Sequence, residues 1–330
     1  MTNGDTFIRR PLIPKGSHPI ETKRYIMSTP EIERAIDRMS QWIENRIPGA
    51  MIWGRPRLGK TRAIRYAITV LPQMFNQTFP VFMFSCKRYR QPNENTFYED
   101  LLKDLGHALF SSGKANAKRG RIVKFLHERA LVNGNNQVVL LIDDAQHLNE
   151  LHYEWLMDVY NELDNVGINL TVILCGQEEL LSQRSAFIAT KKQQLVGRFM
   201  IHEYHFRGVK NVSDLQRCLE SYDNYEIAEY PERSGWSYTR YYFPERFKEG
   251  FRLKNYSQDF FDTIRELRGE SGVTSKPEIP MQYITLCIAY IMKSYGVDGQ
   301  NVEILNQTHW KQAIIKSGYI EAEAYRGVFD

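Results

Sequence analysis

The chain has 330 residues, of which 42% are apolar and 25% charged, as in an ordinary folded globular protein. Its longest apolar runs, 138–142 and 284–292, fall short of the roughly 18 residues that span a bilayer, so we expect no membrane partner. The first residues lack the apolar segment of a secretory signal. The four cysteines form no CxxC pair, which argues against a zinc site or a disulfide framework and favours a cytoplasmic location.

The net charge of +4 is modest, but the basic residues are unevenly distributed. Residues 1–72 carry thirteen Lys and Arg against six Asp and Glu. The segment 114–124 carries five basic residues and no acidic one. This asymmetry indicates a polyanionic partner.

Along the chain, a proline-rich extended arm (1–27) precedes a series of alternating elements. Apolar residues at helical spacing predict a helix from Ser28 to Ile43. After it, short apolar runs predict strands at 50–53, 81–84, 138–142, 170–174 and about 200–206. Helices are expected between them at 61–71, 96–109, 121–131 and 150–163, with two short helical pieces before the last strand. This alternation, with strands that are apolar throughout, predicts an α/β fold with a central parallel sheet covered by helices on both faces.

A phosphate-binding loop follows the first strand. It has the pattern GxxxxGK[ST] and consists of Gly54, Arg55, Pro56, Arg57, Leu58, Gly59, Lys60 and Thr61, with Arg62 next in the helix. Glycines let backbone amides wrap the phosphates, and the helix directs its positive end at them. Lys60 supplies charge to the outer phosphates, and the Thr61 hydroxyl is a ligand for Mg²⁺. The expected cofactors are therefore ATP and Mg²⁺.

The strand 138–142 ends in two carboxylates, Asp143 and Asp144. A buried strand of this kind delivers Asp143 to the Mg²⁺ shell, and Asp144 then polarises the attacking water. The alternative is an ordinary helix N-cap, because a helix follows shortly after.

The loop, followed by LLIDDAQHL, LTVILCGQEEL and QLVGRF, resembles bacterial AAA+ proteins of the ExeA/TnsC group, and within it the TnsC regulators of CRISPR-associated transposons. The resemblance covers about residues 25–210. It implies a P-loop AAA+ core at 28–209, with its parallel sheet flanked by helices, and a mainly helical C-terminal lid with a tail at 210–330. Arg57 departs from the glycine that many such proteins carry, and Asp144 from their more frequent Glu, so ATP hydrolysis is expected to be slow and regulatory.

The resemblance also implies two further catalytic residues. Gln177 falls at the sensor-1 position, and Arg198 at the position of the arginine finger that reaches the ATP of a neighbouring subunit. A strand-end amide and an unpartnered surface arginine are the alternatives.

In initiator-like AAA+ proteins, which include the TnsC group, an extra helical element follows the DNA backbone. It lies between the second strand and the strand that ends in the two aspartates. The matching basic residues here are Lys87, Arg88, Lys114, Lys118, Arg119 and Arg121. Without interleaved aromatic residues, they predict phosphate contacts rather than base reading. A solvated helix face is the alternative.

The C-terminal part contains an aromatic-rich stretch, 222–256, in which Trp236, Tyr238, Arg240 and Tyr242 alternate as in a strand with one packed face. We interpret it as lid core or subunit interface, or else as a docking surface.

By resemblance, the protein is a bacterial cytoplasmic ATPase that assembles with itself on duplex DNA. It would link a TniQ-like targeting protein to TnsA/TnsB-like transposase subunits. Two alternatives remain: a motor-type AAA+ enzyme, such as a helicase loader or ExeA-like secretion ATPase, and an ATP-gated scaffold with little hydrolysis.

Overall fold

The computed structural model describes residues 9–75, 79–132, 134–299 and 305–326. The chain forms two compact units: one consists of residues 34–207, and the other combines residues 1–33 with 208–330. We call them the α/β unit and the helical unit. No helix in the described ranges is both long and apolar enough to cross a membrane.

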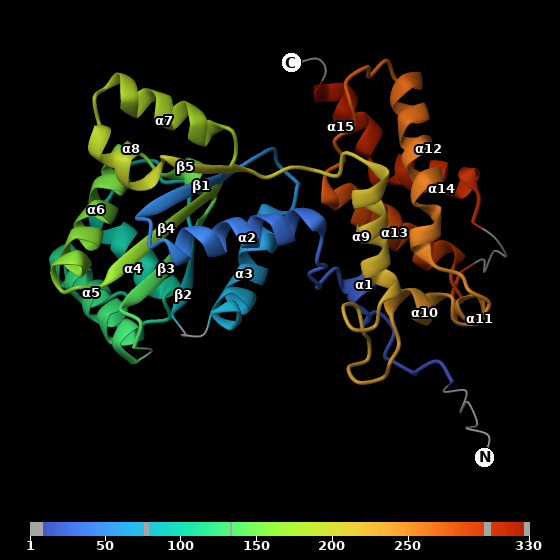
Figure 1. Ribbon diagram of the computed structural model, residues 1–330, viewed down its shortest axis with the longest axis horizontal. Helices are drawn as coiled ribbons and strands as arrows, with labels where there is room; N and C mark the ends of the chain where they lie inside the picture. Colours follow the sequence, from blue (N-terminus) through green and yellow to red (C-terminus); the bar gives the residue numbers. More distant parts are fainter. Residues whose placement is uncertain (1–8, 76–78, 133, 300–304, 327–330) are drawn as a thin grey trace. The chain divides into compact units, whose positions relative to one another are not determined.

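The α/β unit is built on five parallel strands in the order β2-β3-β4-β1-β5. The strands are β1 (Gly49–Trp53), β2 (Val81–Ser85), β3 (Gln137–Asp143), β4 (Asn169–Gly176) and β5 (His202–His205). Its helices are α2 (Pro30–Glu44), α3 (Lys60–Met74), α4 (Glu94–Asp104), α5 (Ala115–Val132), α6 (Glu150–Asn165), α7 (Glu179–Ala189) and α8 (Gln193–Phe199), with the 3-10 turn η1 (Ala145–His147). The predicted parallel α/β architecture is confirmed (Figure 1).

Alternate residues of each central strand face opposite sides of the sheet, so both faces need helices. On β3, Val138, Leu140 and Ile142 belong to the core that the sheet shares with α4, α5 and α6. Helix α3 packs against β2, β3 and β4 but contributes nothing to that core, so it covers the other face. Because the strands are parallel, their carboxyl ends all lie at one edge, and the loops that carry the motifs meet there.

Two helix boundaries differ from the prediction. Helix α4 ends at Asp104 rather than near 109, because Gly106 adopts a left-handed conformation with φ 78°. Helix α5 starts at Ala115 rather than 121, so most of the basic run 114–124 lies on one helix.

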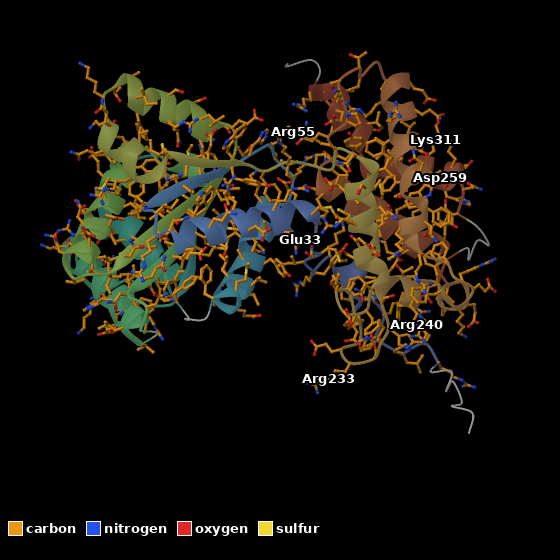
Figure 2. All side chains as sticks on the ribbon, viewed as in Figure 1. Glu33, Arg55, Arg233, Arg240, Asp259 and Lys311 are labelled. Atoms are coloured by element: carbon orange, nitrogen blue, oxygen red, sulfur yellow. The ribbon has the colours of Figure 1, made fainter. Side chains whose placement is uncertain are left out.

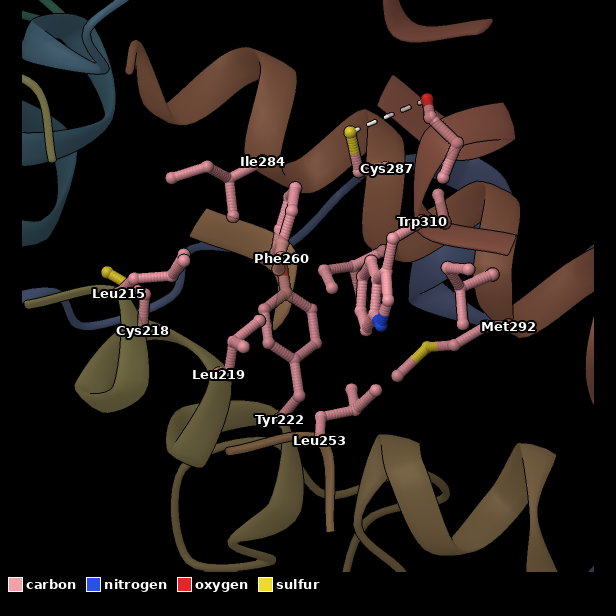
Figure 3. Close-up of a cluster of buried hydrophobic side chains, with 14 of the residues drawn as sticks. Leu215, Cys218, Leu219, Tyr222, Leu253, Phe260, Ile284, Cys287, Met292 and Trp310 are labelled. Carbon is pink, nitrogen blue, oxygen red and sulfur yellow. Dashed lines mark hydrogen bonds between the residues drawn. The ribbon is translucent and has the colours of Figure 1, made fainter. Parts of the chain in front are cut away.

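The helical unit contains α1 (Pro19–Thr22), α9 (Val212–Asp223), α10 (Tyr238–Tyr242), α11 (Pro244–Lys248), η2 (Leu253–Tyr256), α12 (Ser257–Glu270), α13 (Met281–Tyr295), α14 (Gln307–Ser317) and α15 (Tyr319–Arg326). Its core is centred on Phe260 and Trp310, whose rings stack at 4.6 Å (Figure 3). Cys287 of α13 donates to the Ala313 carbonyl oxygen at 3.5 Å and joins α13 to α14 (Figure 3). The predicted mainly helical C-terminal part is confirmed.

The N-terminal segment, which the sequence predicts to be an extended arm, contains the short helix α1 and contributes to the core of the helical unit. Ile20 and Met27 are both buried there. His18 caps α1 by accepting the backbone N–H of Ile20 at 3.1 Å, and its ring lies 4.7 Å from that of Tyr241. Burial lowers the pKa of His18 to about 4, and the charge of Arg10 acts in the same direction. The sequence places the end of the arm at residue 27, whereas the structure groups the chain up to residue 33 with the helical unit.

The aromatic stretch does not form the predicted strand. Ser237 accepts the N–H of Arg240 at 3.2 Å and starts α10, which buries Tyr238, Tyr241 and Tyr242. Arg240, labelled in Figure 2, lies over the Trp236 ring at 4.4 Å. The alternation of aromatic residues did not produce a strand, because Ser237 lies within it and its side chain caps a helix. The buried tyrosines belong to the core of the helical unit, as the lid-core interpretation expected.

Candidate nucleotide-binding site

The loop between β1 and α3 joins a buried strand to a helix, which is the context that the predicted phosphate cradle requires. A Cβ at Gly54 would lie 2.2 Å from the Phe206 carbonyl oxygen, so only glycine fits at the end of β1. Gly59 has φ 109° and precedes α3, which begins at Lys60. Arg57 also lies in the left-handed region with φ 67°, where glycine is more easily accommodated. The sequence departure at Arg57 thus coincides with a strained backbone position.

The Lys60 side chain folds back over this loop. Its Nζ donates to the carbonyl oxygens of Gly54 and Arg55, both at 2.7 Å. Burial lowers the pKa of Lys60, and nearby Cys175 and Asp143 act in the opposite direction. The ammonium group is thereby held inside the cradle, where the predicted phosphate contact needs it.

The two motifs meet through Thr61 and Asp143. Their side chains are hydrogen-bonded to each other, which links the first turn of α3 to the last residue of β3. Burial raises the pKa of Asp143, with the Asp144 charge acting in the same direction and the Thr61 hydrogen bond opposing both. A hydroxyl and a carboxylate oxygen, both suited to Mg²⁺, therefore lie side by side.

Asp144 has a different environment from its neighbour. Asp143 is 6% exposed, whereas Asp144 is exposed to solvent. Asp144 precedes η1, but its side chain makes no capping hydrogen bond, and Asn149 caps the following helix α6 instead. The N-cap alternative for Asp144 is thus not observed. A carboxylate that faces water suits the predicted role in polarising a water molecule, which stays a prediction.

Gln177 directly follows strand β4, which lies between β1 and β3 in the sheet. Because these strands are parallel, Gln177 lies at the same edge of the sheet as the loop and Asp143. Its backbone N–H donates to Oε1 of Gln146 at 3.2 Å. Gln146 itself has no assigned role in the sequence-based interpretation, and its only sequence signal was its position two residues after Asp144. The sensor role of Gln177 stays a prediction.

Arg198 lies near the end of α8, just before the edge strand β5. Its guanidinium carbon is 4.4 Å from the centroid of the Tyr160 ring on α6. The ring contact restrains the side chain, and the described residues include no carboxylate paired with it. The position before an edge strand fits a residue that acts on another subunit, and that role stays a prediction.

The predicted DNA contacts divide into two groups. Arg88 and Lys114 are exposed, and Lys87 is exposed although it pairs with Asp100. Lys118 is only 1% exposed and its ammonium pairs with Glu99 at 2.5 Å. The prediction that Lys118 contacts DNA is therefore wrong, because its charge is directed into the protein.

Two further arginines of this run are occupied within the protein. Arg119 bonds to Asp158 at 3.1 Å and to Glu162 at 2.8 Å, which joins α5 to α6. Arg121 donates to the carbonyl oxygens of Leu109 and Ser112, both at 2.9 Å, and so shapes the loop before α5. The charges of Arg119 and Arg121 therefore have partners within the protein, which gives both residues a structural role.

Comparison with known proteins agrees with this geometry. The sequence profile of a family described as AAA domain matches residues 49–183, a range that contains the loop and both aspartates. Two solved structures of the Aeropyrum pernix ORC2 protein are similar to this chain. The ADP form has a TM-score of 0.61 at 13% identity and covers 92% of this chain and 73% of that chain. The ADPNP-ADP complexes give 0.58 at 12%, with coverage of 91% and 71%. No curated protein sequence matches the chain.

The chain therefore contains an AAA-type ATPase domain, and its fold is that of AAA+ proteins with a helical C-terminal part. The ORC2 likeness is one of fold, because the sequence identity is low.

Proposed function

We propose that this protein is an ATP-dependent switch that binds ATP with Mg²⁺ at the loop 54–61 and hydrolyses the nucleotide slowly. The observation that carries the proposal is the meeting of Lys60, Thr61, Asp143 and the water-exposed Asp144 at one sheet edge. The loop suits a phosphate group, because it leads into the first turn of α3 and Lys60 places its ammonium group beside it.

In hydrolysis a water oxygen bonds to the γ-phosphorus and the bond from that phosphorus to the ADP oxygen breaks. One hydrogen of the water stays on the released phosphate, and the other leaves as a proton to solvent. Asp144 orients this water and accepts its hydrogen bond. Lys60 stabilises the charge on the outer phosphates. Thr61 and Asp143 would hold Mg²⁺, which would supply further positive charge. The strained Arg57 and the short Asp144 side chain support slow turnover.

The switch is proposed to act as a homo-oligomer on duplex DNA. Arg198 would complete the site of a neighbouring subunit, because guanidinium groups stabilise the charge that develops on a transferring phosphoryl group. Lys87, Arg88 and Lys114 are the exposed cations of the inserted segment and would contact phosphates. Lys118, Arg119 and Arg121 would shape this surface rather than contact DNA.

The biological role follows from the resemblance to the ExeA/TnsC group. On that basis the assembly links a TniQ-like targeting protein to TnsA/TnsB-like transposase subunits, and hydrolysis disassembles it. The AAA domain fits a motor-type enzyme equally well. The ATPase rate with and without DNA separates the two: a regulator turns over slowly and a motor turns over fast.

The Lys60→Ala variant tests the proposal. It should lose ATP affinity and ATP-dependent assembly on DNA, because it removes the main positive charge that stabilises the β- and γ-phosphates. Lys316→Ala, which removes an exposed lysine of α14 outside the proposed sites, is the matched control and should keep both. Unchanged ATP binding and assembly in Lys60→Ala would overturn the assignment.

A further inference from the structure

The side-chain amide of Gln146 bridges the ends of two strands. Its Nε2 donates to Oδ1 of Asp144 at 3.1 Å, and its Oε1 accepts the backbone N–H of Gln177 at 3.2 Å. A backbone N–H can only donate, so the amide oxygen must face Gln177 and the NH₂ group must face the carboxylate. One side chain thus joins the residue after β3 to the residue after β4.

The space at the end of β4 is shaped around this amide. A Cβ at Gly176 would lie 2.5 Å from Oε1 of Gln146 and 2.8 Å from Cδ1 of Leu180. Any larger residue at 176 would displace the Gln146 amide or the Leu180 side chain of α7. The glycine therefore belongs to the same arrangement.

The backbone of Gln146 is anchored as well. Nε2 of Gln183, on α7, donates to the carbonyl oxygens of Gln146 and Leu148 at 2.8 and 2.9 Å. Its Oε1 accepts the hydroxyl of the fully buried Tyr153 at 3.2 Å. The turn η1 is thereby tied to α6 and α7, and the Gln146 side chain starts from a fixed point.

Asp144 needs such support. It has φ 52°, in a region that non-glycine residues seldom adopt, and its side chain faces solvent. An exposed carboxylate with free rotation spends little time in any one orientation, whereas water activation needs a fixed one. The Gln146 amide is the group in the described structure that donates a side-chain hydrogen bond to it.

We propose that Gln146 is a positioning residue that holds the Asp144 carboxylate toward the attacking water and ties it to the backbone of Gln177. The inference deepens the proposed ATPase function and rests on it. Because Gln146 bonds to both strand ends, Asp144 and Gln177 keep a constant spacing. Gln183 then links this pair to α7, the helix that precedes Arg198 in the chain.

The variant Gln146→Glu separates the two bonds. Its carboxylate can still accept the Gln177 N–H but places a like charge beside Asp144, while Gln146→Ala removes both contacts. We expect kcat to fall about tenfold or more in each variant, with the ATP Kd changed by less than about twofold.

Hydrogen exchange of the Gln177 amide in nucleotide-free protein gives a readout independent of activity. It should speed up in Gln146→Ala, which lacks the acceptor, and stay protected in Gln146→Glu. Gln146→Asn, a shorter amide, serves if either variant fails to fold. Gln258→Glu is the matched control, because Gln258 also donates to an aspartate, Asp262, but on the exposed surface of α12; it should change nothing.

The outcomes separate the inference from the proposed function. If Asp144→Asn stops hydrolysis while Gln146→Glu keeps the parental kcat, the positioning role is overturned and the ATPase assignment stands. If the parental protein does not hydrolyse ATP, both fall. A reduced kcat in Gln146→Glu, with Gln177 still protected and ATP still bound, supports the inference.

Discussion

The hydroxyl of Thr61 is hydrogen-bonded to the carboxylate of Asp143, so the first turn of α3 and the end of β3 share one polar contact. This pair is the proposed Mg²⁺ site. Thr61→Ala should raise the Mg²⁺ concentration needed for half-maximal ATPase activity about tenfold, the effect of losing one ligand of about 1.4 kcal/mol. Thr61→Ser keeps the hydroxyl and should stay near the parental value. Equal Mg²⁺ dependence in all three proteins would contradict the site.

Asp144→Asn tests the separation of binding from hydrolysis. The amide keeps the size of the side chain but loses the charge that orients and polarises water. ATP should still bind, kcat should fall by about a hundredfold or more, and assemblies on DNA should last longer. The measurement is single-turnover hydrolysis beside the lifetime of the DNA complex. Parental hydrolysis would move the catalytic role to another residue.

Arg198→Ala tests the site between subunits. ATPase activity and assembly should both weaken, and mixing with Asp144→Asn should partly restore turnover, because some mixed interfaces pair an intact Arg198 with an intact Asp144. Arg198→Lys, which keeps the charge but not the planar group on Tyr160, should restore little activity. Co-assembly without restored turnover would show that Arg198 does not act in a neighbouring site.

The basic residues should differ in their effect on DNA binding. Replacing exposed Arg88 and Lys114 by Ala should flatten the plot of log affinity against log salt by about one unit each, equally for unrelated duplexes. Lys118→Met should leave the slope unchanged but destabilise the fold by about 1–3 kcal/mol, because Glu99 loses its partner. A salt titration and a denaturant titration measure the two effects. A flatter slope in Lys118→Met alone would reverse this assignment.

Acid should destabilise the helical unit through His18. Its pKa is lowered to about 4 in the fold against about 6.5 unfolded, so the unfolded chain binds the proton more readily. The stabilising contribution of neutral His18 is fully present above about pH 6.5 and is lost as pH falls toward 4, by up to about 3 kcal/mol. His18→Asn keeps a capping acceptor without titrating, so its unfolding free energy should fall less between pH 7 and 4. Equal pH dependence would contradict this assignment.

The sheet and the placement of the loop 54–61 beside Asp143 were predictable because their signals are local. Apolar runs mark buried strands, and the spacing from Gly54 to Thr61 identifies a loop whose chemistry depends on neighbours in sequence. Asp143 ends a strand that is apolar throughout, so its position at the sheet edge followed directly.

The errors arose where the outcome depends on distant partners. Lys118 belongs to a basic run, but its ammonium group forms an ion pair with Glu99 on another helix, and its side chain is buried. Gln146 looks like an unremarkable glutamine until β4 brings Gln177 beside it. Trp236–Tyr242 alternates like a strand, but the Ser237 cap and the packing of the helical unit decide for a helix.

The helical unit is made from both ends of the chain, with Ile20 near one end and Tyr319 near the other buried in one core. During synthesis the first segment of the helical unit can pack into its core only after nearly three hundred later residues have been made. The α/β unit is complete once residue 207 leaves the ribosome. The nascent protein would therefore form its nucleotide site before its helical unit. A variant shortened by the first 27 residues should accordingly retain the loop 54–61 but expose part of the core around Tyr241.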